Sequence, residues 1–462
     1  MRWYRDLTAR QRTILLVLAW GVVLVVGALV WSVTSTLRAS QRALSVTVDP
    51  SAALVTPIPT PRPTETPQPT PTATPTFDVT RAGTVALRVS EARQTLGGWG
   101  VPVTLVGSTG MARALYRHFR AWPLVLPLRA QEVLQMVRQW PWEKLRLDAV
   151  GQSRQVAAFY APESGDLYLR RDWAGEQDLL LAQVAYGYAR ALPDQVGDII
   201  GLMKETSSLD QQLALAALAE GDAWVTLQLV QGASVDVGEA TSLEMWARAA
   251  VCPWWQMQDD ALEALSCLPF DLGRTFAVAR FHGGGLSAMD KTLQRPPRST
   301  EQLLHPERYA ARDEPLVLIP LEPELDAGWV LTQSETVGEA LIGLILARWE
   351  RQEVSVWTGI PGWGGDLMQI WEDETGQRVA AWHFAWDTSQ AAVAFYRRLL
   401  DVLPRALVPG LMADTTTPFG LPRGHWWAGR QGAVFAYRRG AQVWLIWGAD
   451  GEAVREIASV VP

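Results

Sequence analysis

The chain has 462 residues, of which 48% are hydrophobic and 19% charged, so it is long enough to bury two cores and its composition excludes a disordered protein. Its net charge of −7 and the lack of a basic patch in the sequence argue against nucleic acid as a partner, because phosphate binding requires clustered positive charge. The two cysteines are too few for a disulfide framework and lack the spacing of a zinc knuckle.

The first predicted element is a membrane anchor. Residues 13–37 carry no charge, and an apolar helix of this length can cross a hydrocarbon layer ~30 Å thick. A secretory signal peptide is the competing interpretation, but its apolar region would be only ~7–15 residues long. Arginines precede the segment, at Arg2, Arg5, Arg10 and Arg12, so residues 1–12 are predicted to be a cytoplasmic tail. We therefore expect a single-pass membrane protein whose folded part is extracytoplasmic.

Residues 38–77 are predicted to be a Pro/Thr-rich linker. Between residues 56 and 76 proline alternates with polar residues, mostly threonine, and such a sequence is extended at ~3.1 Å per residue rather than packed. The sequence leaves open whether this segment is a glycosylated stalk or an inert connection.

The first folded domain is expected to span residues 78–312. Two apolar stretches around a turn sequence predict paired strands, at residues 156–160 and 167–170. A helix is predicted over residues 177–192, ending before Pro193 because proline disrupts the hydrogen bonds of a helix. Apolar periodicity predicts a second long helix over residues 208–231.

The second folded domain is expected to span residues 313–462. Arg438 to Ala441 form a turn sequence, which predicts a hairpin near the C-terminus. The predicted helices are residues 336–348, residues 389–403 and a last helix at the C-terminus, and the predicted strands are residues 367–371, 379–386, 433–438 and 442–447. The expected fold class is α+β, with an N-terminal transmembrane helix, a helical or mixed first domain and an α+β second domain.

Several short motifs follow one another in the two folded regions. The first motif spans the end of the first helix and the residues after it, with Ala191, Leu192, Asp194 and Gln195, and the second helix carries Ala217-Leu-Ala-Glu-Gly-Asp-Ala223. Further motifs are residues 297–309, Gly362-Trp-Gly-Gly-Asp366 and Trp386-Asp-Thr388. Together they resemble a family of bacterial, often membrane-anchored zinc-peptidase-like proteins, in which the two helices read roughly H-E-x-x-H-A-L-Q-D-Q and A-L-x-E-G-D/E-A. The resemblance implies a zincin-like fold for the first domain.

The resemblance also implies where a zinc site would lie. In the family, two histidines one helical turn apart bind zinc, a glutamate beside the first deprotonates water, and the next helix supplies the third ligand. The histidine positions correspond to Tyr186 and Arg190, the base position to Gly187, and the third ligand to Glu220. A guanidinium cannot bind a metal ion. The family's hydrolysis is therefore not expected, and no metal or other cofactor is predicted.

No other catalytic motif replaces the zinc site in the sequence. The five histidines, at positions 118, 282, 305, 383 and 425, include no pair one helical turn apart, and there is no G-x-S-x-G motif or complete phosphate-binding loop. A second possible binding group comprises Ser299, Thr300, Glu301, His305 and Tyr309. The alternative interpretation is that Ser299 or Thr300 caps a short helix.

The sequence thus predicts an extracytoplasmic pseudo-peptidase with a binding or structural role, whose inactive cleft holds an extended peptide or protein ligand. Two alternatives remain open. The chain is then either an enzyme, such as a hydrolase, with a non-zinc site that the sequence does not reveal, or a subunit of a membrane-associated assembly.

Two side-chain pairs are expected in the first domain. Cys252 and Cys267 are predicted to form a disulfide, because the anchor places them where oxidation is possible. Arg190 is predicted to take the electrostatic place of zinc and to pair with Glu220, since a buried carboxylate without a partner is costly, with the Tyr186 hydroxyl joining the pair. The alternative is that Arg190 faces solvent.

Overall fold

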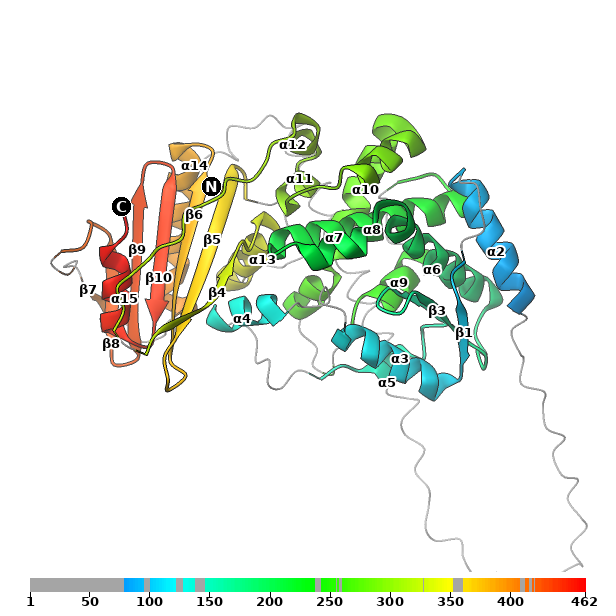
Figure 1. Cartoon of the computed structure of the whole chain (residues 1–462), viewed down its shortest axis with the longest axis horizontal. Coiled ribbons are helices and arrows are strands. Elements are labelled where there is room, and N and C mark those ends of the chain that lie inside the picture. The colour runs from blue at the N-terminus through cyan, green and yellow to red at the C-terminus, as the bar shows by residue number, and fades with distance from the viewer. Residues whose placement is uncertain are drawn as a thin grey trace, which may run out of the picture. The chain divides into compact units, whose positions relative to one another are not determined.

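The structure is a computed structural model that describes residues 79–462 apart from short segments, at 95–99, 122–127, 138–145, 237–241, 255, 257–259, 327, 352–359, 408–411, 415–417 and 419 (Figure 1). The described residues belong to one compact unit, Ala73–Pro462. The predicted cytoplasmic tail (1–12), transmembrane helix (13–37) and linker (38–77) lie outside the described residues.

The first elements form a small mixed sheet with helices around it. Its strand order is β1-β3-β2, with β1 parallel and β2 antiparallel to β3, so the predicted pairing of the two strands around residue 163 is confirmed. The elements are α2 (Val79–Ala92), β1 (Val103–Val106), α3 (Ser108–Ala121), α4 (Leu128–Met136), α5 (Ala149–Gln152), β2 (Ala158–Ala161) and β3 (Asp166–Arg170).

Helices make up the next part of the chain. They are α6 (Gln177–Gly197), α7 (Ile199–Glu205), α8 (Leu209–Val230), α9 (Ser242–Val251), α10 (Asp260–Gln294), α11 (Thr300–Leu304) and α12 (Pro306–Ala311). Helix α8 agrees with the helix predicted over residues 208–231, and the Ser208 side chain caps it by accepting a hydrogen bond from the Gln211 N–H. Among the described residues it alone is long and apolar enough to cross a membrane, and 89% of its most apolar window is buried in the fold.

The predicted end of α6 is wrong. The helix continues through Pro193 to Gly197 and ends where Asp198 adopts a left-handed conformation with φ of 47°. Proline removes one N–H donor but leaves the remaining hydrogen bonds of the helix in place, and Pro193 is buried here. Tertiary packing therefore overrides the local signal.

Helices α8 and α10 approach each other closely at two glycines. A Cβ atom on Gly273 would lie 1.8 Å from the Ala217 carbonyl oxygen, and one on Gly221 would lie 2.1 Å from the Gly273 carbonyl oxygen. No other residue leaves the two backbones this close. The pair fixes the position of α8, which carries Glu220, against α10.

The C-terminal part is built on a seven-stranded antiparallel sheet with the order β4-β5-β6-β10-β9-β8-β7. Its helices and strands agree with the predicted ones to within a few residues, and β4, β7 and β8 are additional. The elements are β4 (Val330–Glu335), α13 (Glu339–Glu350), β5 (Trp363–Glu372), β6 (Arg378–Trp386), α14 (Ser389–Ala406), β7 (Met412–Asp414), β8 (His425–Gly429), β9 (Gly432–Arg439), β10 (Gln442–Gly448) and α15 (Gly451–Ser459).

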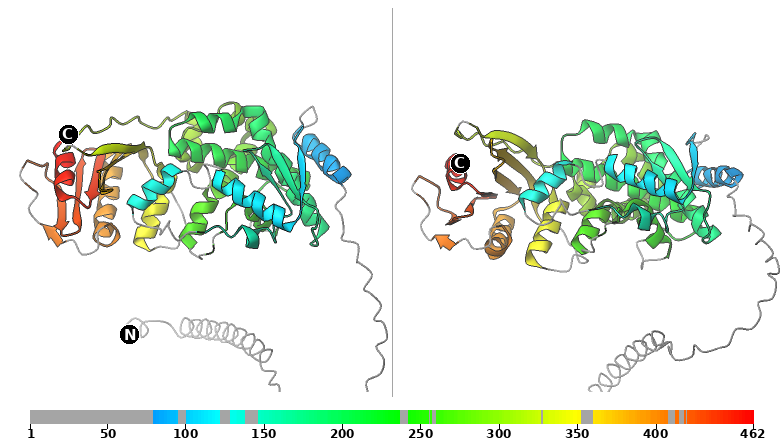
Figure 2. Two further views of the ribbon diagram at one scale, coloured as in Figure 1. Left: turned by 60° about the horizontal axis from the view of Figure 1, so that its bottom comes forward. Right: turned by 90° about the horizontal axis from the view of Figure 1, so that it is seen from below.

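Side chains alternate between the two faces of this sheet. On β10, Leu445 and Trp447 pack in a large core with α13 and α14, whereas Trp444 and Ile446 pack in a smaller core with α15. The large core also contains Leu213 of α8 and other residues of α8 and α10. The chain is thus a mixed α/β protein with a sheet in its C-terminal part (Figures 1 and 2). One core crosses the predicted boundary between residues 312 and 313.

Candidate functional site

The three polar residues that the sequence resemblance assigns to zinc-ligand positions meet in the structure. The Arg190 Nη2 atom lies 2.9 Å from Glu220 Oε1, with side-chain exposures of 11% and 9%. The Tyr186 hydroxyl donates a hydrogen bond of 2.8 Å to Glu220 Oε2. The ion pair expected from the sequence is therefore present, and each carboxylate oxygen of Glu220 has a partner.

This arrangement keeps Tyr186 protonated. Burial, and then the negative charge of Glu220, raise the pKa of the Tyr186 hydroxyl well above its ordinary value. A neutral phenol remains a donor to the carboxylate at every physiological pH. The Tyr186 hydroxyl therefore completes the Arg190–Glu220 pair and is not available as a base.

A small pocket, partly open to solvent, is lined by these residues. Tyr186, Gly187 and Arg190 of α6 and Glu220 of α8 all line it. Its other walls come from strand β2, from the end of α9, from α10 and from α3. All four positions that the sequence assigns to the former zinc site thus face one cavity.

Gly187 stands where the resemblance places the catalytic base. A Cβ atom there would lie 2.3 Å from Leu167 Cδ1 on strand β3 and 3.7 Å from the Tyr160 backbone nitrogen on β2. A side chain would fit only if Leu167 moved. The absence of a side chain lets α6 pack closely against the sheet beside the pocket.

Strand β2 is an edge strand, and part of it lines the pocket. The Arg170 N–H donates to the Ala157 carbonyl. Because hydrogen-bonded pairs alternate along an antiparallel ladder, residues 159 and 161 are also hydrogen-bonded to β3. The backbone N–H and carbonyl groups of Ala158 and Tyr160 therefore face away from β3. The Ala158 N–H is taken by the Gln183 side chain. The backbone groups of Tyr160 thus lie on the edge of β2 that pairs with no strand of the described part.

The disulfide expected between Cys252 and Cys267 is present, with their Cα atoms 5.0 Å apart. It joins the end of α9 to α10, and Cys252 lines the pocket. The Gln152 side-chain amide donates to the Cys252 carbonyl at 2.9 Å. These contacts fix one wall of the pocket.

His118 on α3 also lines the pocket, although nothing in the sequence singled it out. Its Nδ1 atom lies 2.8 Å from Glu163 Oε2. Burial acts to raise the pKa of Glu163, but the hydrogen bond and charge of His118 bring it below its ordinary value. His118 could not be predicted because α3 is about 70 residues from α6 in the sequence and carries no family motif.

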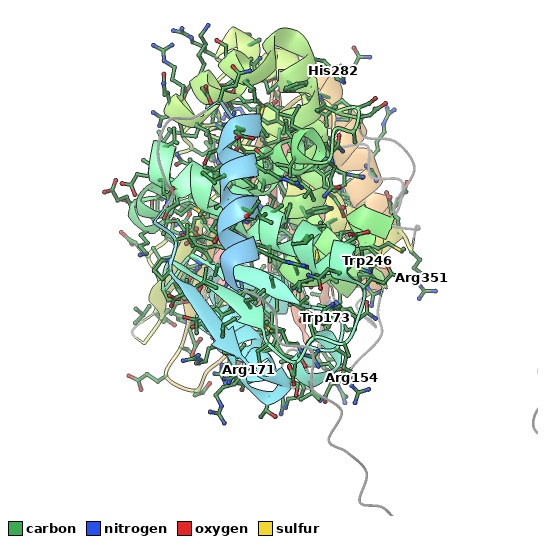
Figure 3. The ribbon with its side chains drawn as sticks, turned by 90° about the vertical axis from the view of Figure 1, so that its right-hand side faces the viewer. Arg154, Arg171, Trp173, Trp246, His282 and Arg351 are labelled. Atoms are coloured by element: carbon green, nitrogen blue, oxygen red, sulfur yellow. A yellow bond between two sulfur atoms is a disulfide. The ribbon has the colours of Figure 1, made fainter. Side chains whose placement is uncertain are left out.

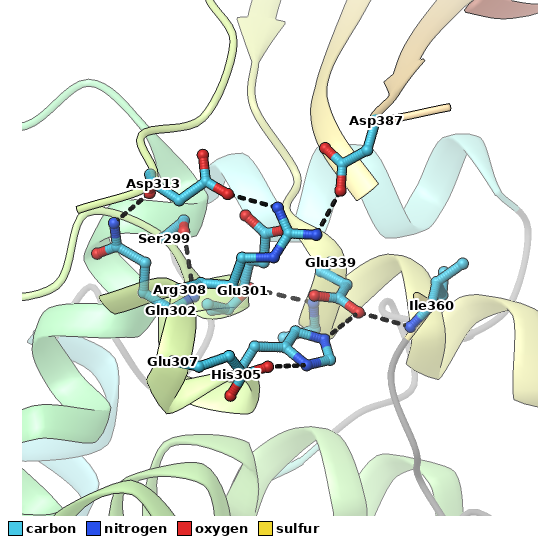
Figure 4. Close-up of polar contacts among 12 residues, drawn as sticks. Ser299, Glu301, Gln302, His305, Glu307, Arg308, Asp313, Glu339, Ile360 and Asp387 are labelled. Carbon is cyan, nitrogen blue, oxygen red and sulfur yellow. Dashed lines mark hydrogen bonds and ion pairs between the residues drawn. The ribbon is translucent and has the colours of Figure 1, made fainter. Parts of the chain in front are cut away.

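The second predicted binding group lies away from the pocket, around the start of α11 (Figure 4). Ser299 caps α11 by accepting a hydrogen bond from the Gln302 N–H, which is the structural alternative that the sequence offered. His305 Nε2 lies 3.2 Å from Glu339 Oε1, and Arg308 pairs with Asp313 and Asp387. The Tyr309 hydroxyl donates to the Arg295 carbonyl at 2.8 Å.

Several buried carboxyl groups connect α8, α11, α13 and β5 in this region. Asp210 Oδ1 accepts hydrogen bonds from the Thr300 N–H and hydroxyl, and Asp366 accepts from the Trp382 indole and two backbone N–H groups. Burial raises the pKa of Asp210 and of Glu301 to about 8 and that of Asp366 to about 6. The Glu339 hydrogen bond raises the pKa of His305. The network joins the helical part to the sheet.

Stability should fall with rising pH because of Asp210. In the folded state the Asp210 carboxyl keeps its proton up to about pH 8, whereas the unfolded chain loses it above about pH 4. The contribution is therefore complete below pH 4 and is lost as the pH rises to 8. We expect Asp210→Asn to remove this decline. The free energy of unfolding of the variant should therefore rise relative to that of wild type by about 1 kcal/mol per pH unit between pH 5 and 8.

Urea denaturation at pH 5, 6, 7 and 8 measures this difference. Glu324→Gln, which neutralises an exposed carboxylate, is the matched control and should leave the slope unchanged. Parallel curves for Asp210→Asn and wild type would show that Asp210 is ionised in the fold.

The residues present do not fit a zinc ion. Arg190 brings a positive charge to the position of a ligand, and within the described part of the chain no three His, Cys, Asp or Glu side chains are grouped as metal ligands would be. What the arrangement offers in place of a metal site is a pocket lined by a paired arginine and glutamate and by part of β2.

Comparison with known proteins adds one match. Residues 329–458, less than a third of the chain, match the model of a domain of unknown function (DUF8575). No curated protein and no solved structure is significantly similar to the chain. The zinc-peptidase resemblance therefore stays a prediction from the sequence motifs.

Proposed function

We propose that the chain is a membrane-anchored, extracytoplasmic pseudo-peptidase that binds an extended peptide without cleaving it. The observation that carries the proposal is the Arg190–Glu220–Tyr186 cluster in a pocket that is also lined by part of the edge strand β2. A peptidase that had lost its metal would need a cation to neutralise the remaining carboxylate, and Arg190 supplies one. The zincin-like fold of residues 78–312 is part of this proposal.

Peptide binding at this site would use the Tyr160 backbone groups, which point away from β3. An extended peptide adds to a sheet edge through main-chain hydrogen bonds, while pockets beside the edge select its side chains. The Tyr160 N–H and carbonyl offer one such pair of hydrogen bonds. Among the charged groups lining the pocket, Arg190 and Glu220 are paired with each other, so selection would rest mainly on shape and on the apolar side chains Phe159 and Phe270.

A backbone substitution tests this mode of binding. Tyr160→Pro and Tyr160→Ala both remove the ring, but only proline removes the N–H, and proline is accepted in edge strands. We expect Tyr160→Pro to bind peptides from a casein digest at least about 10-fold more weakly than Tyr160→Ala, since the loss of one ladder hydrogen bond and its register is worth about 1.4 kcal/mol. Affinity is measured by fluorescence anisotropy with the best-retained labelled peptide. Equal affinities would exclude binding along β2.

Restoring ligands tests the relation to zinc peptidases. Tyr186 and Arg190 both reach Glu220, so histidines at these positions should converge on one metal ion. We expect the Tyr186→His/Arg190→His variant to retain about one zinc ion per chain after dialysis, and wild type to retain none. Zinc is measured by elemental mass spectrometry.

The control is the same double variant with Glu220→Ala, which should lose most of its zinc because the third ligand is gone. A folded double variant that binds no zinc would contradict the assignment of these positions. Stoichiometric zinc in wild type would instead overturn the pseudo-peptidase proposal.

A further inference from the structure

Helix α3 presents a row of arginines to solvent. Arg113, Arg117 and Arg120 are spaced by four and three residues, so they share one face of the helix, and all three are exposed. The opposite face packs Met111 and Leu115 into a small core. The helix contains no acidic residue, and its arginines form no ion pair with a carboxylate of the described residues.

Neighbouring segments extend the positive charge. Helix α5 packs beside α3 and is followed by the exposed Arg154, and the Arg171 N–H bonds to the Val106 carbonyl just before α3 begins. Figure 3 labels Arg154 and Arg171 along one border of the molecule, and α3 comes to the front in the left view of Figure 2. We call the five exposed arginines, Arg113, Arg117, Arg120, Arg154 and Arg171, the basic face.

The five arginines of the basic face come from three separate segments, so no run of basic residues in the sequence indicates it. It contrasts with the net charge of −7 of the whole chain, so the charge is unevenly distributed. Two less polar side chains stand among the arginines: Tyr116 is 44% exposed and Val150 on α5 is 62% exposed. Arginines mixed with an aromatic and an aliphatic side chain suit the boundary between lipid headgroups and acyl chains.

We propose that the basic face docks on the anionic phospholipid surface of the membrane that holds the chain. The proposal goes beyond the proposed peptide binding and rests on the anchor predicted at residues 13–37. A tether keeps the face at high effective concentration near the lipid, so weak contacts suffice. Clustered arginines are attracted to a surface of anionic lipid headgroups, and salt screens this attraction.

Docking would also orient the pocket. His118 lies on the inner side of α3, lines the pocket and pairs with Glu163, whose negative charge is also close to Arg117. The helix that contacts lipid therefore forms one wall of the peptide site. A docked domain presents that wall toward the membrane surface.

The experiment uses the full chain reconstituted in liposomes, with flotation and resistance to alkaline extraction as the separate test of the anchor. Hydrogen exchange of α3 is compared between liposomes of zwitterionic lipid alone and liposomes with about one third anionic lipid. We expect at least a twofold drop in deuterium uptake over residues 108–121 with anionic lipid, and recovery in high salt.

Matched variants separate docking from nonspecific charge. Arg113→Gln/Arg117→Gln/Arg120→Gln should abolish the drop, and the corresponding lysine variant should retain it. Arg397→Gln/Arg430→Gln/Arg439→Gln removes the same charge from exposed positions in the C-terminal part and should leave the drop intact. Equal uptake with both lipid compositions in properly inserted protein would overturn the proposal. The proposal would also be overturned if adding soluble DNA to zwitterionic liposomes lowered the deuterium uptake of α3 more than anionic lipid does. That result would indicate that the face binds a soluble polyanion.

Discussion

Glu220→Ala should destabilise the protein by on the order of 3–5 kcal/mol, because it leaves the Arg190 guanidinium almost buried and without its carboxylate. The Arg190 side chain is only 11% exposed, so water can replace little of the lost interaction. The Tyr186 hydroxyl also loses its acceptor, which adds to the cost of an unsatisfied buried group. Urea denaturation with linear extrapolation gives the free energy of unfolding.

Replacing both charged partners should cost less than removing one of them. Arg190→Met/Glu220→Leu fills a similar volume without leaving a charge unpaired, and buried ion pairs are often exchanged for apolar residues at little cost. The difference between the double variant and the sum of the single ones measures the coupling. A loss below about 1 kcal/mol for Glu220→Ala would contradict the buried pair, since that is the range of an exposed one.

Gly273→Ala should destabilise the protein by at least about 3 kcal/mol, because the added methyl group would meet backbone rather than a movable side chain. Its Cβ would lie 1.8 Å from the Ala217 carbonyl oxygen on α8. The two helices must then separate, which opens the core that they share. Thermal and urea denaturation, followed by circular dichroism, measure the effect.

Gly283→Ala is the control for Gly273→Ala. It lies in the same helix, α10, with no atom within 4 Å of its Cβ position. We expect it to be neutral or to stabilise by up to about 1 kcal/mol, because alanine favours the helix over glycine. If the two variants behaved alike, the close contact between α8 and α10 would not exist in solution.

Local signals in the sequence predicted most elements of the C-terminal part. The turn sequence from Arg438 to Ala441 predicted the hairpin of β9 and β10, and Gly440 with φ of 59° lies in that turn. Thr388 caps α14 by accepting from the Ala391 N–H, which fixes the start of that helix. Such signals involve only a few neighbouring residues, so they can be recognised in a single sequence.

Pairings between distant segments could not be predicted in this way. Strand β1 pairs in parallel with β3 across more than 60 residues, and its four residues carry no distinctive pattern. The meeting of Tyr186 and Arg190 with Glu220 was predicted only through the resemblance, since spacing alone does not say which helices touch. His118 and the basic face were missed for the same physical reason: their residues come together only when α3, α5 and β3 fold.

The core that α8 shares with α13 and the large sheet bears on how this chain could have been assembled in evolution. The stretch that matches the family model begins at residue 329, between α12 and β4, as an independent domain would. In space it is not independent, because its helix α13 packs against α8 and α10, and the Trp447 indole donates a hydrogen bond to the Met136 carbonyl at the end of α4. A copy of this stretch alone would expose the apolar residues of α13 that share this core, and the Trp447 indole would lose its acceptor. Mutations in α8 are therefore constrained by two neighbours at once, the Glu220 site and helix α13.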